Sequence, residues 1–206
     1  QSPKAYVDEA NERDISIFEL LNEKVKDQMP GESGLIVLDW HNGNRSVLSD
    51  SNLKGCVFGM SLQTTHEELY RAYLEATAFG TKMIMQQYQS WNMDVEDVFA
   101  CGGIPKKNPL MMDIYANVLN KKVTIIDSEY APAIGAAILG SVCGGAHQTL
   151  NEAIESMKEP VLYEVTPDPE KVKRYKKLFS AYKELHDIHG YKKARIMRNV
   201  GKLMEA

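Results

Sequence analysis

The residues best suited to chemistry lie in one short segment, Cys101-Gly102-Gly103-Ile104-Pro105-Lys106-Lys107-Asn108. Its paired glycines follow an apolar run, so a ligand can approach the backbone closely before a helix begins. Lys106 and Lys107 add positive charge, and Asn108 offers both a donor and an acceptor. The same residues fit a tight turn in which Asn108 caps the next helix. The residue types alone favour neither a nucleotide cradle nor a turn, and the spacing matches neither a Walker A motif nor GxGxxG.

A second candidate is the helix start Ala131-Pro132-Ala133-Ile134-Gly135-Ala136-Ala137, which is rich in small residues. Small side chains such as Ala133 and Gly135 permit contact between the backbone at a helix N-terminus and a flat or anionic ligand. They equally permit close packing of the helix on a sheet, which is the interpretation that the residues favour.

A third candidate is the polar cluster of Asn42, Gly43 and Arg45, which follows an apolar run. The Arg45 guanidinium suits a phosphate or carboxylate, because its N–H groups can bind two oxygens at once. A salt bridge within the fold explains Arg45 at least as well.

The remaining reactive residue types predict no catalytic centre. His186 and His189 lie three apart without a further ligand in register, and the five histidines show no metal spacing. Cys56, Cys101 and Cys143 are odd in number and widely spaced, so we interpret them as buried thiols of a reducing compartment. No Ser/His/Asp set and no carboxylate pair stands out. We therefore predict no catalytic residue and no metal ligand in this chain.

Alternating strand and helix patterns supply the framework that positions these candidates. Short apolar runs predict strands at 34–40, 55–62, 95–100 and 123–126. Capping pairs, in which glutamate follows three residues later, predict helix starts after Ser16, Thr65 and Thr149. Further helices are predicted from Pro109, over 132–145 and after Asp168. This order of elements favours a layered α/β domain.

Composition and charge narrow the class of protein. The chain has 206 residues, of which 44% are hydrophobic and 25% charged, so one globular domain with a real core is expected. A net charge of −4 with interspersed signs favours neither a nucleic-acid partner nor a membrane surface. The apolar stretch 131–146 is shorter than the roughly 20 residues that span a bilayer, so a buried helix is predicted there. The start Gln1-Ser2-Pro3 predicts no secretory signal.

We divide the chain into a helical lead-in over 1–33, a core over 34–190 and a basic tail over 191–206. The tail is predicted to be solvated rather than to bind a specific acidic ligand. Its basic residues are Lys192, Lys193, Arg195, Arg198 and Lys202.

Several segments in one order resemble the FGGY family of carbohydrate kinases. Residues 101–118 look like a signature of that family, and 34–46 with 70–81 are similar to its branch that acts on L-ribulose. The likeness runs from about Asp14 to about His189. It implies an α/β fold of the actin-like ATPase (ribonuclease H-like) type. The matched part is the C-terminal domain, and its sheet is expected to be incomplete in a fragment.

The resemblance also implies an activity and its ligands. ATP with Mg²⁺ is expected to phosphorylate the terminal hydroxyl of L-ribulose, giving L-ribulose 5-phosphate in arabinose catabolism in the cytoplasm. By this likeness Gly102, Gly103, Lys107 and Asn108 contact the adenosine part of ATP or ADP. Ala133 and Gly135 correspond to a segment that flanks the nucleotide cleft. The sequence leaves the oligomeric state open, a homodimer included.

The chain departs from the family in length, because members are much longer and their catalytic aspartate, sugar pocket and phosphate-binding strands precede the matched part. We therefore expect the sugar to be held mainly by an N-terminal portion, and the 206-residue chain alone to be inactive. The alternatives are another FGGY kinase, acting on xylulose, glycerol or a related polyol or ketose, and a non-catalytic interaction module if the chain stands alone.

Overall fold

A computed structural model describes residues 3–203, and the side chains of residues 3–199. The ends of the predicted lead-in and tail, 1–2 and 204–206, and the side chain of Lys202 lie outside this description. The helices are α1 (Lys4–Glu12), α2 (Ile17–Val25), α3 (His66–Ser90), α4 (Gly103–Lys107), α5 (Pro109–Leu119), α6 (Ala131–Cys143), α7 (Leu150–Met157), α8 (Pro169–Asp187), the π-helix η1 (Ile188–Lys192) and α9 (Ala194–Leu203). The strands are β1 (Ile36–Leu38), β2 (Cys56–Phe58), β3 (Val98–Ala100), β4 (Val123–Ile126) and β5 (Val161–Val165).

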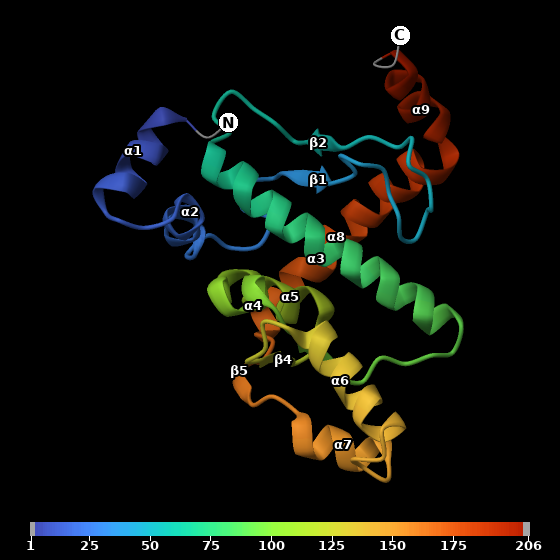
Figure 1. The fold of residues 1–206 in the computed structure, drawn as a ribbon. Coiled ribbons are helices and arrows are strands. Elements are labelled where there is room, and N and C mark those ends of the chain that lie inside the picture. Colours follow the sequence, from blue (N-terminus) through green and yellow to red (C-terminus); the bar gives the residue numbers. More distant parts are fainter. Residues whose placement is uncertain (1–2, 204–206) are drawn as a thin grey trace.

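The strands form two small sheets. β1 and β2 are an antiparallel pair, with Val37 opposite Val57. In the other sheet β4 lies in the middle, parallel to β3 and antiparallel to β5. Figure 1 shows α3 crossing the molecule between the β1–β2 pair and the layer that holds α4, α5 and β4. The predicted layered α/β character is therefore present, but the sheet is divided.

The strand predicted over 55–62 is shorter than expected, because the chain turns at Gly59. This glycine has a φ of +86°, and a Cβ there would collide with the carbonyl oxygen of Gly34. Pairing therefore ends at Phe58. Both requirements, the left-handed backbone and the close approach, exclude any residue with a side chain.

The main core lies where α3, α5 and α8 meet under the β1–β2 pair. Phe79 of α3 is its centre, and the Phe79 ring centroid lies 5.1 Å from that of Tyr182 and 5.8 Å from that of Phe179. Ile114 of α5 and Leu38 of β1 complete the cluster and are fully buried. Burying such aromatic and branched side chains stabilises the fold by about 1.5–3 kcal/mol each.

The predicted helix starts are confirmed by their capping contacts. The Ser16 hydroxyl accepts a hydrogen bond from the Glu19 backbone N–H at 3.1 Å. Thr65 and Glu68 form a complete capping box at the start of α3. The Asp168 carboxylate accepts hydrogen bonds from two backbone N–H groups in the first turn of α8. Each cap supplies partners for donors that a helix leaves unpaired at its first turn.

The prediction that the helix over 132–145 is buried is wrong. No residue of α6 is buried, and Leu139 is 59% exposed. The helix packs chiefly on α7, and Figure 1 shows the α6–α7 pair projecting away from the rest of the chain. The apolar character that suggested burial is real, but the described residues provide no element to cover it.

The prediction of buried cysteines is also wrong, since Cys101 and Cys143 are exposed and Cys56 is half-buried. Cys143 lies on the uncovered helix α6, and Cys101 follows β3, a strand at the edge of its sheet. Within residues 3–203 no helix is long and apolar enough to cross a membrane.

Candidate functional site

The glycine segment lies at the carboxyl end of the parallel pair β3 and β4, where ligands of α/β sheets bind. Gly102 has a φ of +97°, and a Cβ there would meet no atom within 4 Å. Its backbone N–H donates to the Ser128 carbonyl at 2.9 Å, which ties the two strand ends together. The glycine is thus required by its backbone conformation, and the space above it is open to another group.

The segment predicted as a loop is partly helical. Residues Gly103–Lys107 form α4, and the Asn108 backbone N–H bonds to the Ile104 carbonyl at 2.9 Å. The Tyr163 hydroxyl donates to the Pro105 carbonyl at 2.6 Å and holds α4 against β5. A proline near its start suits this short helix, because the first backbone N–H groups of a helix need no helical acceptor.

Asn108 caps the next helix, as the simpler interpretation of the sequence proposed. Its side-chain oxygen accepts from the Met111 backbone N–H at 3.0 Å, and Pro109 occupies the first position of α5. The amide nitrogen remains for another partner. The Tyr70 hydroxyl lies beside it and donates to Asn22 Oδ1 at 2.8 Å. Burial raises the pKa of Tyr70, and the neighbouring Asn108 side chain partly offsets this. The side-chain oxygen of Asn108 is therefore committed to the cap, and its amide nitrogen is the donor that faces Tyr70 and could serve a ligand.

The two lysines of the segment have different roles. Lys106 forms an ion pair with Asp127, with Nζ 2.7 Å from Oδ1, and its Nζ lies 3.6 Å from Glu129 Oε1. The hydrogen bond with Asp127, followed by the charges of both carboxylates, raises the pKa of Lys106. Lys107 forms no ion pair among the described side chains. Lys107 is thus the cation of this segment that remains available to an anionic ligand.

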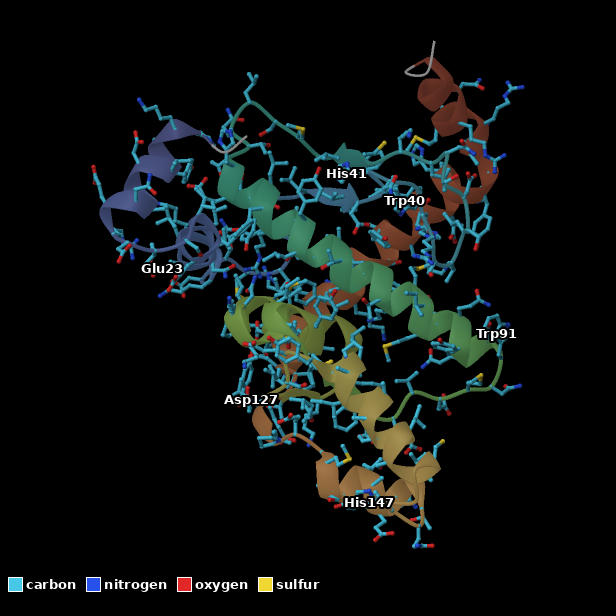
Figure 2. All side chains as sticks on the ribbon, viewed as in Figure 1. Glu23, Trp40, His41, Trp91, Asp127 and His147 are labelled. Atoms are coloured by element: carbon cyan, nitrogen blue, oxygen red, sulfur yellow. The ribbon has the colours of Figure 1, made fainter. Side chains whose placement is uncertain are left out.

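The sequence interpretation missed the residues that follow β4. Asp127 pairs with Lys106, and Ser128 accepts the bond from Gly102. The Ser128 hydroxyl is buried and has no hydrogen-bond partner within the described part of the chain. Figure 2 labels Asp127 beneath α4 and α5. The parallel register, with Ala100 opposite Ile125, brings the ends of β3 and β4 to one edge. The signal was present: polar residues follow both strands at the edge where ligands bind.

The small-residue helix start lies close in sequence to this edge. α6 begins at Ala131, three positions after the Ser128 carbonyl to which Gly102 is bonded. Ala133 and Gly135 are exposed, and a Cβ at Gly135 would meet nothing within 4 Å. The sequence favoured packing of this helix start on a sheet. The described elements do not show such packing.

The third cluster lies elsewhere, in the connection between β1 and β2. Gly43 has a φ of +77°, and a Cβ there would collide with the Ser51 backbone. Arg45 lines a cavity of about 360 Å³. The salt bridge that was the alternative explanation of Arg45 is not formed with any described side chain. The cluster and the glycine segment are thus separate sites.

No three histidine, cysteine, aspartate or glutamate side chains gather into a metal-binding group within the described residues. The β3–β4 edge offers backbone groups, the Lys107 cation and the Asn108 amide, together with the carboxylates of Asp127 and Glu129, which lie within ion-pair distance of Lys106. Its chemistry is that of binding and orienting a ligand.

Comparison with known proteins shows the family to which the chain is related. The model of the C-terminal domain of the FGGY family of carbohydrate kinases matches residues 3–143. A ribulokinase of Staphylococcus aureus (strain Newman) is 73% identical over 203 residues, covering 98% of this chain and 37% of that protein. The chain therefore spans little more than a third of the length of such relatives.

Solved structures of sugar kinases resemble the fold of this chain. A xylulose kinase from Rhodospirillum rubrum superposes with a TM-score of 0.75 at 25% identity, over 90% of this chain and 36% of that one. Plasmodium falciparum glycerol kinase with ADP superposes with a TM-score of 0.58 at 20% identity, over 82% of this chain and 36% of that one. These kinases have the actin-like ATPase fold, so the expected fold class is confirmed. The chain belongs to the FGGY family of carbohydrate kinases and corresponds to a C-terminal part of its members.

Proposed function

We propose that this chain is the nucleotide-binding part of an ATP-dependent kinase that converts L-ribulose to L-ribulose 5-phosphate, in arabinose breakdown in the cytoplasm. The observation that carries the proposal is Gly102 at the β3–β4 edge, with a left-handed backbone and open space where a side chain would stand. Identity of 73% to a ribulokinase supports the choice of sugar.

In this proposal the residues around Gly102 bind the adenosine part of the nucleotide. Gly102 and Gly103 let the ligand lie against the backbone, because neither carries a side chain. The amide nitrogen of Asn108 donates to the ligand, and Lys107 supplies charge towards the phosphates. Ala133 and Gly135 form the opposite wall, where small residues leave room for a flat group.

ATP supplies the phosphoryl group when bound, and the residues of this chain orient it. Mg²⁺ is commonly held by nucleotide phosphates and one or two carboxylates. The two carboxylates at this edge, Asp127 and Glu129, both lie within ion-pair distance of Lys106, so we propose that the Mg²⁺ ligands of the protein lie outside this chain. The catalytic base and the sugar pocket are proposed to lie there too.

The exposed helix α6 supports a larger protein. Leu139 on α6 and Leu150 at the start of α7 are 59% and 46% exposed. In a folded protein, the apolar face of a helix is normally buried against another element. We propose that the rest of the kinase packs on this face, and that the isolated chain binds nucleotide without transferring phosphate.

Calorimetry with ADP and a kinase assay with ATP and L-ribulose test both parts of the proposal. We expect ADP to bind the isolated chain, and Lys107→Ala to weaken binding roughly three- to tenfold, as one charge-assisted contact would. Lys173→Ala removes an exposed lysine of α8 and serves as the control. Absence of ADP binding contradicts the nucleotide role, and turnover of about 1 to 100 per second contradicts the inactivity of the isolated chain.

The second candidate is an interaction module, favoured by the same exposed face of α6. In that case the chain forms a stable homodimer through α6 and does not bind ADP. Sedimentation of the chain alongside the ADP titration separates the two functions, because only the module requires a dimer without nucleotide.

A further inference from the structure

The segment predicted as a solvated basic tail folds back onto the core. Ala194 and Met197 of α9 are 7% and 5% exposed and belong to the main core cluster. The sulfur of Met197 lies 3.9 Å from that of Cys56 on β2. Figure 1 shows α9 beside the connection between β1 and β2, so these contacts hold Arg195 and Arg198 next to that connection.

A cavity of about 680 Å³ lies between α9 and that connection. Its size is within the range of about 300–1,000 Å³ that small-molecule sites occupy. Leu48 is its apolar member, and its polar lining consists of Ser49, Asp50, Asn52, Arg195, Arg198 and Asn199. Such a lining of hydroxyl, amide and guanidinium groups suits a small, strongly polar ligand.

Asp50 and Arg198 neutralise each other within this cavity. Nε and Nη2 of Arg198 lie 2.7 and 2.6 Å from Oδ2 of Asp50. The other carboxylate oxygen of Asp50 accepts from the Asn52 backbone N–H at 2.9 Å. This backbone bond first, and then Arg198, lowers the pKa of Asp50, so the carboxylate stays charged. The pair forms a rigid side of the cavity with no net charge.

Arg195 is the charged side chain of this cavity that has no carboxylate partner among the described residues. It is exposed, and none of the described carboxylates lies within ion-pair distance of its guanidinium. The sequence from Ile188 to Arg198 contains no acidic residue. The single positive charge of Arg195, beside hydroxyl and amide groups, suits a ligand that carries one anionic group and several hydroxyls.

We propose that this cavity binds a small polyol phosphate, with the phosphate on Arg195 and the ligand hydroxyls on Asn52, Asn199 and Asp50. A monoester phosphate offers the oxygens that a guanidinium binds in a fork. The cavity is too small for a nucleic-acid strand to make its usual extended contacts, so a small molecule is the better fit. Figure 1 shows α9 and α4 on opposite sides of α3, so this site is distinct from the proposed nucleotide site.

Calorimetry of the 206-residue chain with glycerol 3-phosphate, inorganic phosphate and glycerol tests the proposal. We expect glycerol 3-phosphate to bind more tightly than phosphate, and glycerol not to bind. Arg195→Ala should weaken glycerol 3-phosphate binding about tenfold, and Arg195→Lys less, because the lysine keeps the charge but loses the fork. Arg174→Ala, an exposed arginine of α8 outside the cavity, is the matched control.

Asn199→Ala provides a second test that leaves the charge unchanged. It should reduce the preference for glycerol 3-phosphate over phosphate, because it removes a partner of the hydroxyls only. Equal affinity in the Arg195→Ala and Arg174→Ala variants overturns the proposal, as does equal affinity for phosphate and glycerol 3-phosphate in the unmodified chain. Loss of glycerol 3-phosphate binding in Lys107→Ala also overturns it, because that variant alters only the nucleotide site.

Discussion

The Tyr175 hydroxyl donates a hydrogen bond of 3.0 Å to Oε1 of Glu75, across 100 positions of sequence. The bond joins α8 to α3 in the interior, where Tyr175 is 1% and Glu75 2% exposed. Arg71 completes the group: its Nε lies 3.1 Å from Glu75 Oε1, and its Nη1 donates to the Val25 carbonyl at 2.8 Å. Three helices are thus fixed around one buried charge pair.

Removing one partner of this pair is expected to cost more than removing the tyrosine hydroxyl. Glu75→Ala leaves the Arg71 guanidinium buried and unpaired, so it should lower the free energy of unfolding by about 3–5 kcal/mol. Tyr175→Phe removes one hydrogen bond and should cost about 1–3 kcal/mol. Urea unfolding measures both, with the exposed Glu184→Ala as control. Equal losses for Glu75→Ala and Glu184→Ala contradict this account of the pair.

Protonation of His186 is expected to make stability depend on pH. Burial lowers the pKa of His186, although Asp187 partly offsets this, and the ring packs edge-on against Trp40 at 5.3 Å. The folded state therefore favours the neutral ring, and this contribution is present above the unfolded pKa of about 6.5 and lost as pH falls. The free energy of unfolding should decrease from about pH 7 towards pH 5.

The variant His186→Gln isolates that contribution. It cannot take up the proton, so its unfolding free energy should change less with pH over the same range. Thermal or urea unfolding of both proteins at matched ionic strength is the measurement. Parallel pH profiles for the two proteins contradict a role of His186.

Two glycine substitutions are expected to have opposite effects. Gly59→Ala forces a side chain into a left-handed turn and against the Gly34 carbonyl, so it should destabilise the chain by more than about 1 kcal/mol. Gly140 lies inside α6, and a Cβ there would meet nothing within 4 Å. Gly140→Ala should therefore stabilise the chain by about 0.5–1 kcal/mol. Differential scanning calorimetry distinguishes the signs, and the same sign for both variants contradicts the geometry.

The two roles of Asn108 can be separated by substitution. Asn108→Ser keeps an oxygen that can cap α5, so stability should change by less than about 0.5 kcal/mol, whereas Asn108→Ala should cost about 1 kcal/mol. Both variants lack the amide donor and should weaken ADP binding to a similar degree. If Asn108→Ser binds ADP as the unmodified chain does, the amide has no role in the nucleotide site.

The sequence predicted features that depend on local chemistry. The capping box at Thr65, the cap at Asp168 and the cap at Asn108 each follow from residues within four positions of one another. The candidate site at the β3–β4 edge could be proposed for the same reason, because its glycines and polar residues stand together at Gly102–Asn108.

What the sequence could not predict depends on distant parts of the chain. The pairing of Lys106 with Asp127 requires β3 to lie parallel to β4, and no local pattern specifies which strands pair. The exposure of α6 has another cause. Its apolar residues predicted a buried helix, and that prediction is wrong, because no described residue of α6 is buried.

The central claim is that the backbone at Gly102 forms a nucleotide site, and an NMR titration with ADP tests it most directly. Glycine amide nitrogens resonate apart from those of most other residues, so Gly102 and Gly103 can be followed against Gly59 and Gly190 as distant references. We predict that the first two signals shift in proportion to bound ADP while the references stay in place. Saturating ADP that leaves Gly102 and Gly103 unchanged contradicts the account.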